Sequence, residues 1–311
     1  MRWLYSLLAM LIALAGYTLL IYTPTQVKYA ERYPTSRTPE EVSLDYRDVT
    51  ITVPGENLSL EAWYIPTTQK PRAAFLFLHG GSSNRHSDFF EAMAFYQALT
   101  RNGYSVLTID LRNHGNSDSD GEGMSFGVRE SRDALAALAW LRSELPDSAL
   151  FMMGISMGGA TAIHAVANGA SPDGLVLLDP LLDTNSTFTL GIWTQTGWPP
   201  ALFTPAAWSA KTFHGFPAGE REAKALAVEL LLPTLLIQDP DDPVTLASYA
   251  REVAAANPAI RYWQAPSVDS NDPRFAWKGR WGSHVAAFAA FPDETMATID
   301  SFVADVLAGN H

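Results

Sequence analysis

A serine between two glycines is the strongest chemical signal in the sequence. The pentapeptide Gly-Ile-Ser-Met-Gly at 154–158 follows an apolar run of strand length and precedes an alanine-rich segment, 160–167, that is typical of a helix. A serine at such a strand-to-helix turn has a cramped backbone, and its hydroxyl is exposed beyond the end of the strand. The N–H of Met157, at the start of the helix, can then donate to an oxyanion beside it. These features suit the nucleophile Ser156, although small residues also simply allow a strand and a helix to pack closely.

The residues that other chemistries need are missing. There is no cysteine, which excludes disulfides, thiolate metal sites and cysteine nucleophiles. No histidine pair has the spacing of a helical zinc site, and no glycine loop carries the lysine of a phosphate-binding site, so we expect neither a metal nor a cofactor. The formal net charge of −12 argues against a nucleic-acid-binding surface.

Buried strands that alternate with helices must position the serine. Continuous apolar runs such as Ala73–Leu78 are typical of strands covered on both faces, and their alternation with helices predicts a mainly parallel sheet in an α/β fold. Ligands on such sheets bind beyond the carboxyl ends of the strands. The expected strands are 48–53, 58–65, 73–78, 104–109, the run from Leu150 to the serine turn, 174–178, 234–237 and 259–265. The expected helices are 89–99, 128–145, 160–167, 244–255 and 294–307.

One long interruption of this pattern predicts a lid. Leu181–Gly219 carries several tryptophans and phenylalanines among glycine, proline and threonine. A lid inserted there would cover the site, and its aromatic side chains would either contact an apolar substrate or pack the lid onto the body. A second insertion, Ser267–Gly282, ends just before a histidine.

The amino terminus predicts a membrane anchor. Trp3–Tyr22 contains no charge, and about 20 helical residues span the roughly 30 Å of a bilayer core. A cleavable signal peptide with a site near Ala13–Ala15 is the alternative, and a buried globular helix is the third; the apolar run continues past 15, which favours an uncleaved anchor over 1–22. Residues 23–45 are polar and proline-containing and are expected to be a linker. Basic residues lie on both sides of the apolar run, and we expect the remainder, 46–311, outside the cytoplasm.

Five motifs in this order resemble the α/β-hydrolase superfamily over about 46–308. They are His79-Gly80, the stretch Asp110–Ser117, the serine pentapeptide, Asp242-Pro243-Val244, and Gly282-Ser283-His284. The anchor and the short lid are similar to bacterial single-pass hydrolases of the esterase or serine-aminopeptidase-like kind. The resemblance implies a mainly parallel eight-stranded sheet with helices on both faces and a small lid insertion.

The resemblance also implies a triad in the order serine, acid, histidine. Ser156 would be the nucleophile and His284 the base. The acid would be Asp242, aligned on Asp-Pro-Val, with its neighbours Asp239 and Asp241 as alternatives. Asp179, after the strand 174–178, is a further rival, because some relatives take their acid from there.

The oxyanion hole would combine the backbone N–H groups of Gly81 and Met157. We expect a serine hydrolase that cleaves a carboxylic ester, with a lipid-like or acyl substrate suggested by the anchor and the aromatic lid. Amide or peptide cleavage, or acyl transfer, would use the same acyl-enzyme. A non-catalytic binding protein of the same fold is the alternative from another class. The expected partners are a small ester substrate and the membrane; the sequence does not indicate an oligomeric state.

Overall fold

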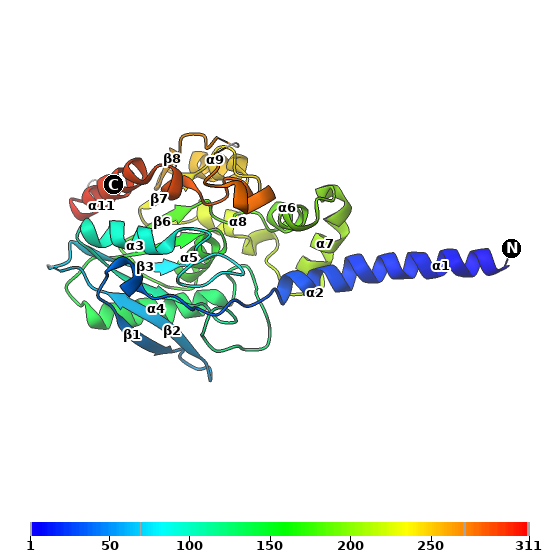
Figure 1. The fold of residues 1–311 in the computed structure, drawn as a ribbon, viewed down its shortest axis with the longest axis horizontal. Helices are drawn as coiled ribbons and strands as arrows, with labels where there is room; N and C mark the ends of the chain where they lie inside the picture. The colour runs from blue at the N-terminus through cyan, green and yellow to red at the C-terminus, as the bar shows by residue number, and fades with distance from the viewer. Residues whose placement is uncertain (1, 69, 270–271, 310–311) are drawn as a thin grey trace.

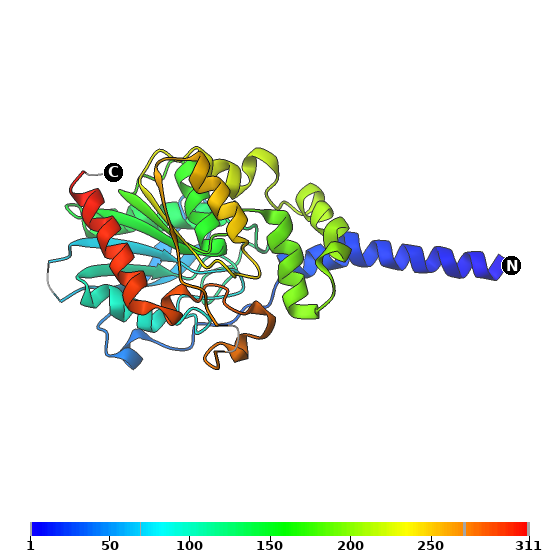
Figure 2. The same ribbon diagram turned by 90° about the horizontal axis from the view of Figure 1, so that it is seen from above.

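An eight-stranded sheet forms the centre of the molecule (Figures 1 and 2). The computed structural model describes residues 2–68, 70–269 and 272–309. In the strand order β1-β2-β4-β3-β5-β6-β7-β8, β2 is antiparallel to both of its neighbours and all other pairs are parallel, which confirms the predicted fold class. The strands are β1 (Arg47–Thr52), β2 (Ser59–Ile65), β3 (Ala73–Leu78), β4 (Tyr104–Ile109), β5 (Leu150–Ile155), β6 (Gly174–Leu178), β7 (Thr234–Gln238) and β8 (Ile260–Gln264).

Helices cover both faces of the sheet. Along β3, Leu76 and Leu78 belong to the core beneath α4, α5, α8 and α9, whereas Phe75 and Phe77 belong to the core beneath α3 and α11. The strand is therefore buried on both faces, which explains its uninterrupted apolar sequence. The helices are α3 (Ala92–Arg101), α4 (Glu130–Glu144), α5 (Met157–Ala167), α8 (Ala223–Val228), α9 (Ala247–Ala256), α10 (Ala287–Ala290) and α11 (Pro292–Leu307), with 3₁₀ turns η2 (Pro39–Val42), η4 (Gly219–Arg221) and η5 (Ala276–Trp281).

Two helices begin three residues later than predicted. The helix expected from Phe89 begins at Ala92, because Glu91 has a left-handed backbone (φ 59°) and the N–H of Ala92 donates to Ser87 O at 3.0 Å in a preceding turn. The helix expected from Val244 begins at Ala247, because an aspartate side chain takes the N–H groups that would start it. Apolar periodicity alone does not reveal such turns.

The predicted lid is helical and lies beside the N-terminal helix (Figures 1 and 2). It contains α6 (Thr184–Thr196), the 3₁₀ turn η3 (Pro200–Phe203) and α7 (Thr204–Phe213). The N-terminal helix runs without a break from α1 (Arg2–Tyr17) through a π-helical turn, η1 (Thr18–Tyr22), into α2 (Thr23–Lys28). It is long and apolar enough to cross a membrane, and α1 projects away from the body.

The segment expected as a linker, 23–45, is not extended at its start and lies along the body. Its first six residues are α2, because the apolar helix continues past Tyr22. Farther on, Arg32 Nε donates to Gly115 O at 2.7 Å, and Thr35 Oγ1 donates to Asp110 Oδ2 at 2.8 Å. The first residue of the expected anchor, two residues of the second insertion (270–271) and the last two residues of the expected hydrolase region lie outside the described residues.

Candidate active site

Ser156 lies at a strained turn between β5 and α5, beyond the carboxyl edge of the sheet. Its backbone has φ 49° and ψ −116°, a conformation that is costly for a residue with a side chain. The flanking glycines are required by close packing, because a Cβ at Gly154 would lie 2.2 Å from Gly158 O and one at Gly158 would lie 2.1 Å from Leu78 O. The glycines thus serve tight packing, and this packing holds the serine in its strained conformation.

His284 lies against the serine hydroxyl. Its Nε2 is 3.1 Å from Ser156 Oγ, and its Nδ1 is 2.7 Å from Asp242 Oδ2. The histidine follows β8 and the aspartate follows β7, so the parallel strands bring both to the same edge of the sheet as the serine. The side chains of His284 and Asp242 are both buried.

The loop after β7 holds the carboxylate of Asp242 in a fixed orientation. Oδ1 accepts the N–H groups of Val244 (2.7 Å) and Thr245 (2.8 Å), and Oδ2 accepts the Thr245 hydroxyl (2.7 Å) as well as facing the imidazole. These four contacts fix the positions of both carboxylate oxygens. This aspartate can therefore orient the imidazole and stabilise an imidazolium.

The three rival aspartates have other partners. Asp179 Oδ1 accepts the N–H of Asp239 at 2.7 Å, Asp239 Oδ1 accepts the N–H of Asp241 at 2.9 Å, and the Asp241 carboxylate accepts the hydroxyl of Ser267. Within the described part of the chain, none of the three forms a hydrogen bond to the imidazole of His284.

Burial keeps two of these rivals from ionising easily. Burial, and then the neighbouring carboxylates of Asp242 and Asp239, raise the pKa of Asp179 well above its usual value. Burial also raises the pKa of Asp239 to about 6. One carboxylate oxygen of each, Oδ2, is buried and has no hydrogen-bond partner within the described residues. The carboxylate of Asp242 differs from both, because two N–H groups and a hydroxyl donate to it.

Lys278 contacts the backbone of His284, and the sequence does not indicate this contact. Its ammonium donates to the backbone oxygen of His284 at 3.2 Å and lies 4.2 Å from the centre of the Phe89 ring. Burial lowers the pKa of Lys278 to about 8, opposed by nearby carboxylates. The lysine is thus a buried cationic group near the carboxyl groups of Asp179, Asp239 and Asp242.

The glycine loop after β3 passes directly beside the serine. A Cβ on Gly80 would lie 3.5 Å from Ser156 Cβ. The N–H groups of Gly81 and Met157 donate to no other group in the described part of the chain, which leaves them free for an oxyanion.

A buried histidine fixes this loop. His79 Nε2 accepts the N–H of Leu111 at 3.0 Å, and its Nδ1 donates to Gly80 O at 2.7 Å. Burial lowers the pKa of His79 to about 3, so the ring stays neutral and can accept a hydrogen bond at Nε2 while it donates one from Nδ1. This histidine positions the loop and does not face the serine.

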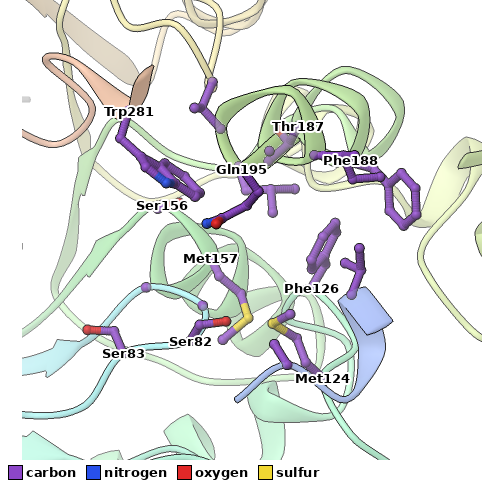
Figure 3. Close-up of a pocket in the computed structure, with 18 of the residues that line it drawn as sticks. Ser82, Ser83, Met124, Phe126, Ser156, Met157, Thr187, Phe188, Gln195 and Trp281 are labelled. Carbon is purple, nitrogen blue, oxygen red and sulfur yellow. The ribbon is translucent and has the colours of Figure 1, made fainter. Parts of the chain in front are cut away.

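A cavity of about 720 Å³ opens in front of Ser156 (Figure 3). Apolar side chains from three parts of the chain line it: the lid (Phe188, Ile192, Phe203), the loop 124–126 (Met124, Phe126) and the N-terminal helix with the residues just after it (Tyr22, Val27, Ala30). Gln195 and Trp281 lie near the serine. The cavity has the volume of a small-molecule site. The contribution of α2 was not predicted from the sequence.

Comparisons with known proteins agree with this architecture. An esterase of Pyrococcus furiosus superposes with a TM-score of 0.70, at 23% identity, over 88% of this chain and 96% of that chain. Est1E of Butyrivibrio proteoclasticus, solved with ferulic acid, superposes with a TM-score of 0.60 at 15% identity, over 84% and 99% of the two chains. The family model described as serine aminopeptidase, S33, matches residues 69–208. The chain has the α/β-hydrolase fold.

Curated relatives match over less than half of this chain. Lysophosphatidylserine lipase ABHD12 of Danio rerio is 31% identical over 122 residues, which cover 38% of this chain and 30% of the relative. Monoglyceride lipase of Rattus norvegicus is 29% identical over 150 residues, 48% of each chain. The alignment thus spans less than a third of the first relative and about half of the second. In residues 2–68, 70–269 and 272–309, no group of side chains has the composition of a metal site.

Proposed function

We propose that this α/β hydrolase is a membrane-anchored serine esterase that cleaves a carboxylic ester with an apolar acyl part. Ser156 is the nucleophile, His284 the general base and acid, and Asp242 the residue that orients the imidazole. The observation that carries the proposal is the hydrogen-bonded series from Asp242 Oδ2 through the imidazole to Ser156 Oγ, at 2.7 and 3.1 Å.

Each step of the reaction has a group in place. Ser156 Oγ attacks the ester carbonyl carbon while its proton passes to His284 Nε2, and the N–H groups of Gly81 and Met157 donate to the oxyanion. The carbonyl re-forms, the bond to the leaving oxygen breaks, and the imidazolium returns the proton to the departing alcohol. Water then attacks the acyl-enzyme by the same route, releasing the acid and restoring the serine hydroxyl.

The lining of the cavity supports an apolar acyl group. Phenylalanine, methionine and isoleucine side chains from the lid and the 124–126 loop face the space next to Ser156. Burial of each additional methylene there is worth about 0.8 kcal/mol. Relatives named as lipases and structural neighbours named as esterases support the same reaction class.

A second candidate is removal of an amino-terminal residue from a peptide. It is favoured by the description of the matching family model and by Glu31, a carboxylate that lines the cavity and would attract an ammonium group. The acyl-enzyme would be the same, and only the leaving group would differ.

The proposed domain organisation is an anchor over 1–22, a segment 23–45 that joins it to the catalytic domain, and a catalytic domain from 46 onwards with a lid at about 181–219. The apolar N-terminal helix supports the anchor. We place the catalytic domain on the extracytoplasmic side of the membrane.

Covalent labelling tests the proposal. A fluorophosphonate probe should label the full-length protein in detergent micelles, and Ser156→Ala should eliminate both labelling and ester turnover. Ser83→Ala is the matched control, because this serine also lines the cavity, whereas the serine that His284 Nε2 meets is Ser156. Undiminished labelling of folded Ser156→Ala would refute the assignment. Comparing p-nitrophenyl esters of increasing chain length with aminoacyl p-nitroanilides separates the esterase from the aminopeptidase.

A further inference from the structure

The lid exposes large apolar side chains where a water-facing helix would be polar. Trp198, Leu202, Trp208 and Phe213, here named the lid face, have exposed fractions of 62%, 50%, 53% and 70%. Helix α7 directs its small residues inward and its large aromatic ones outward, the inverse of an ordinary surface helix. Clustered exposed aromatics of this kind mark an interaction surface.

The lid segment is also almost free of charge. Between 184 and 219 the sequence has one residue among Asp, Glu, Lys and Arg, which is Lys211, whereas 17% of the whole chain is charged. Lys211 is three-quarters buried and lies 3.6 Å from Glu222, on the side of the body. The outward surface of the lid therefore presents aromatic and aliphatic groups without the charges that keep a surface in water.

The position of α7 along the N-terminal helix indicates what covers this surface. Ser209 Oγ donates to Leu20 O at 2.5 Å, and His214 Nε2 lies 3.2 Å from the same oxygen. About 20 helical residues cross the bilayer core, so a span over Trp3–Tyr22 ends near the level of Leu20. Helix α7 is bonded to the helix at that level. Figures 1 and 2 both show it beside the point where the N-terminal helix leaves the body.

We propose that the lid face is a bilayer-docking surface, seated in the headgroup region of the leaflet from which the N-terminal helix emerges. The proposal rests on the membrane span proposed above. Tryptophan and phenylalanine side chains suit this depth, and Trp208 and Phe213 form an edge-to-face pair with ring centres 5.5 Å apart. Since α6 and α2 line the cavity of Ser156 and both pack against α7, an acyl chain enters the cavity from the bilayer without crossing bulk water.

Single-cysteine labelling of the full chain in lipid bilayers tests the docking. The natural sequence has no cysteine, so Phe213→Cys can carry one environment-sensitive fluorophore. Leu231→Cys is the matched control: Leu231 is 95% exposed but precedes β7, at the edge of the sheet opposite the lid. Leu14→Cys, within the apolar helix, reports on the span itself. Brominated phosphatidylcholine is the lipid-side quencher and iodide the aqueous one.

Docking predicts that brominated lipid removes about half or more of the emission at 213, as at 14, and leaves 231 unchanged, while iodide shows the reverse. If iodide quenches the fluorophore at position 213 as strongly as the one at 231, while brominated lipid still quenches the one at 14, the docking is overturned but the membrane span is kept. Lipid-independent protection of 213 that disappears on dilution would assign the face to a second copy of the chain and overturn the proposal. If brominated lipid also leaves the fluorophore at position 14 unquenched, the membrane span on which the docking rests is refuted.

A turnover measurement separates docking from catalysis. Phe213→Asp should lower hydrolysis of a long-chain ester held in vesicles about tenfold, the loss expected for one large apolar anchor, and leave a water-soluble short ester unaffected. Leu231→Asp should change neither. If Phe213→Asp leaves both rates unaltered, the lid face does not dock; if no variant or parent turns over either ester, the proposed activity itself fails while the fluorescence result stands.

Discussion

Replacing Asp242 by asparagine tests the candidate triad at its most specific contact. The carboxylate oxygen Oδ1 accepts two backbone N–H groups, from Val244 and Thr245, so the amide oxygen of an asparagine must take that place. The amide NH₂ is then directed at His284 Nδ1, where the carboxylate oxygen now lies at 2.7 Å. A donor there forces Nδ1 to accept, which puts the imidazole proton on Nε2, facing Ser156.

An imidazole with its proton on Nε2 cannot remove the proton of the serine hydroxyl. The corresponding change in a serine protease with the same triad lowers turnover about 10⁴-fold, or about 5 kcal/mol at 1.36 kcal/mol per tenfold. We expect a loss of the same order in kcat, with little change in KM. The melting temperature should change little, because the amide oxygen keeps both N–H donors and the volume is unaltered.

The assay is the hydrolysis of a soluble p-nitrophenyl ester by full-length protein in detergent, with fluorophosphonate labelling rate as a second measure. Asp241→Asn is the matched control from the same turn, since its carboxylate contacts Ser267 and not the imidazole, and it should cost less than tenfold. An Asp242→Asn protein within tenfold of the parent, together with an inactive Asp179→Asn, would show that the acid comes from the end of β6.

Three further outcomes follow from the packing and the charges. Gly158→Ala should prevent folding or sharply lower the melting temperature measured by circular dichroism, because its Cβ would lie 2.1 Å from Leu78 O. Burial raises the pKa of Asp179 above its ordinary 3.8, so the stability that this group contributes is complete below about pH 4 and is lost as the pH rises through the folded-state pKa. The melting temperature of the parent should therefore fall over that pH range. Asp179→Asn should show a smaller fall and stay active. Removing residues 2–23 should leave the sheet folded but lower turnover of long-chain more than short-chain esters, because Tyr22 and Thr23 line the cavity; equal turnover of both would contradict this.

The sheet was predictable because each strand has a local signature. A strand covered on both faces, such as β3, needs apolar side chains at every position, and the sequence shows them. The serine pentapeptide was recognisable for the same reason, since its glycines are required by contacts within one strand–turn–helix unit and with the adjacent β3. These signals are visible because residues close in sequence create them.

Contacts between distant segments left no such signal. The bonds from Ser209 and His214 to Leu20 join residues about 190 positions apart, and nothing in the apolar run around Leu20 indicates a partner. The contribution of α2 to the cavity likewise depends on packing between distant segments, since α2 contacts α7. For the same reason the sequence could only rank the aspartates near the turn, whereas the hydrogen bonds distinguish their surroundings.

The two sides of Ser156 carry different groups, which bears on the proposed reaction. On the histidine side, burial keeps Asp179 and Asp239 from ionising easily, and the carboxylate that meets the imidazole is that of Asp242, 2.7 Å from Nδ1. In that proposed reaction, proton transfer from the serine creates a positive imidazolium and a negative oxyanion. The carboxylate of Asp242, bonded to His284 Nδ1, would lower the free energy of the imidazolium, while the oxyanion would lie next to the N–H groups of Gly81 and Met157. The two new charges therefore form in regions of opposite polarity, which favours their separation across the site.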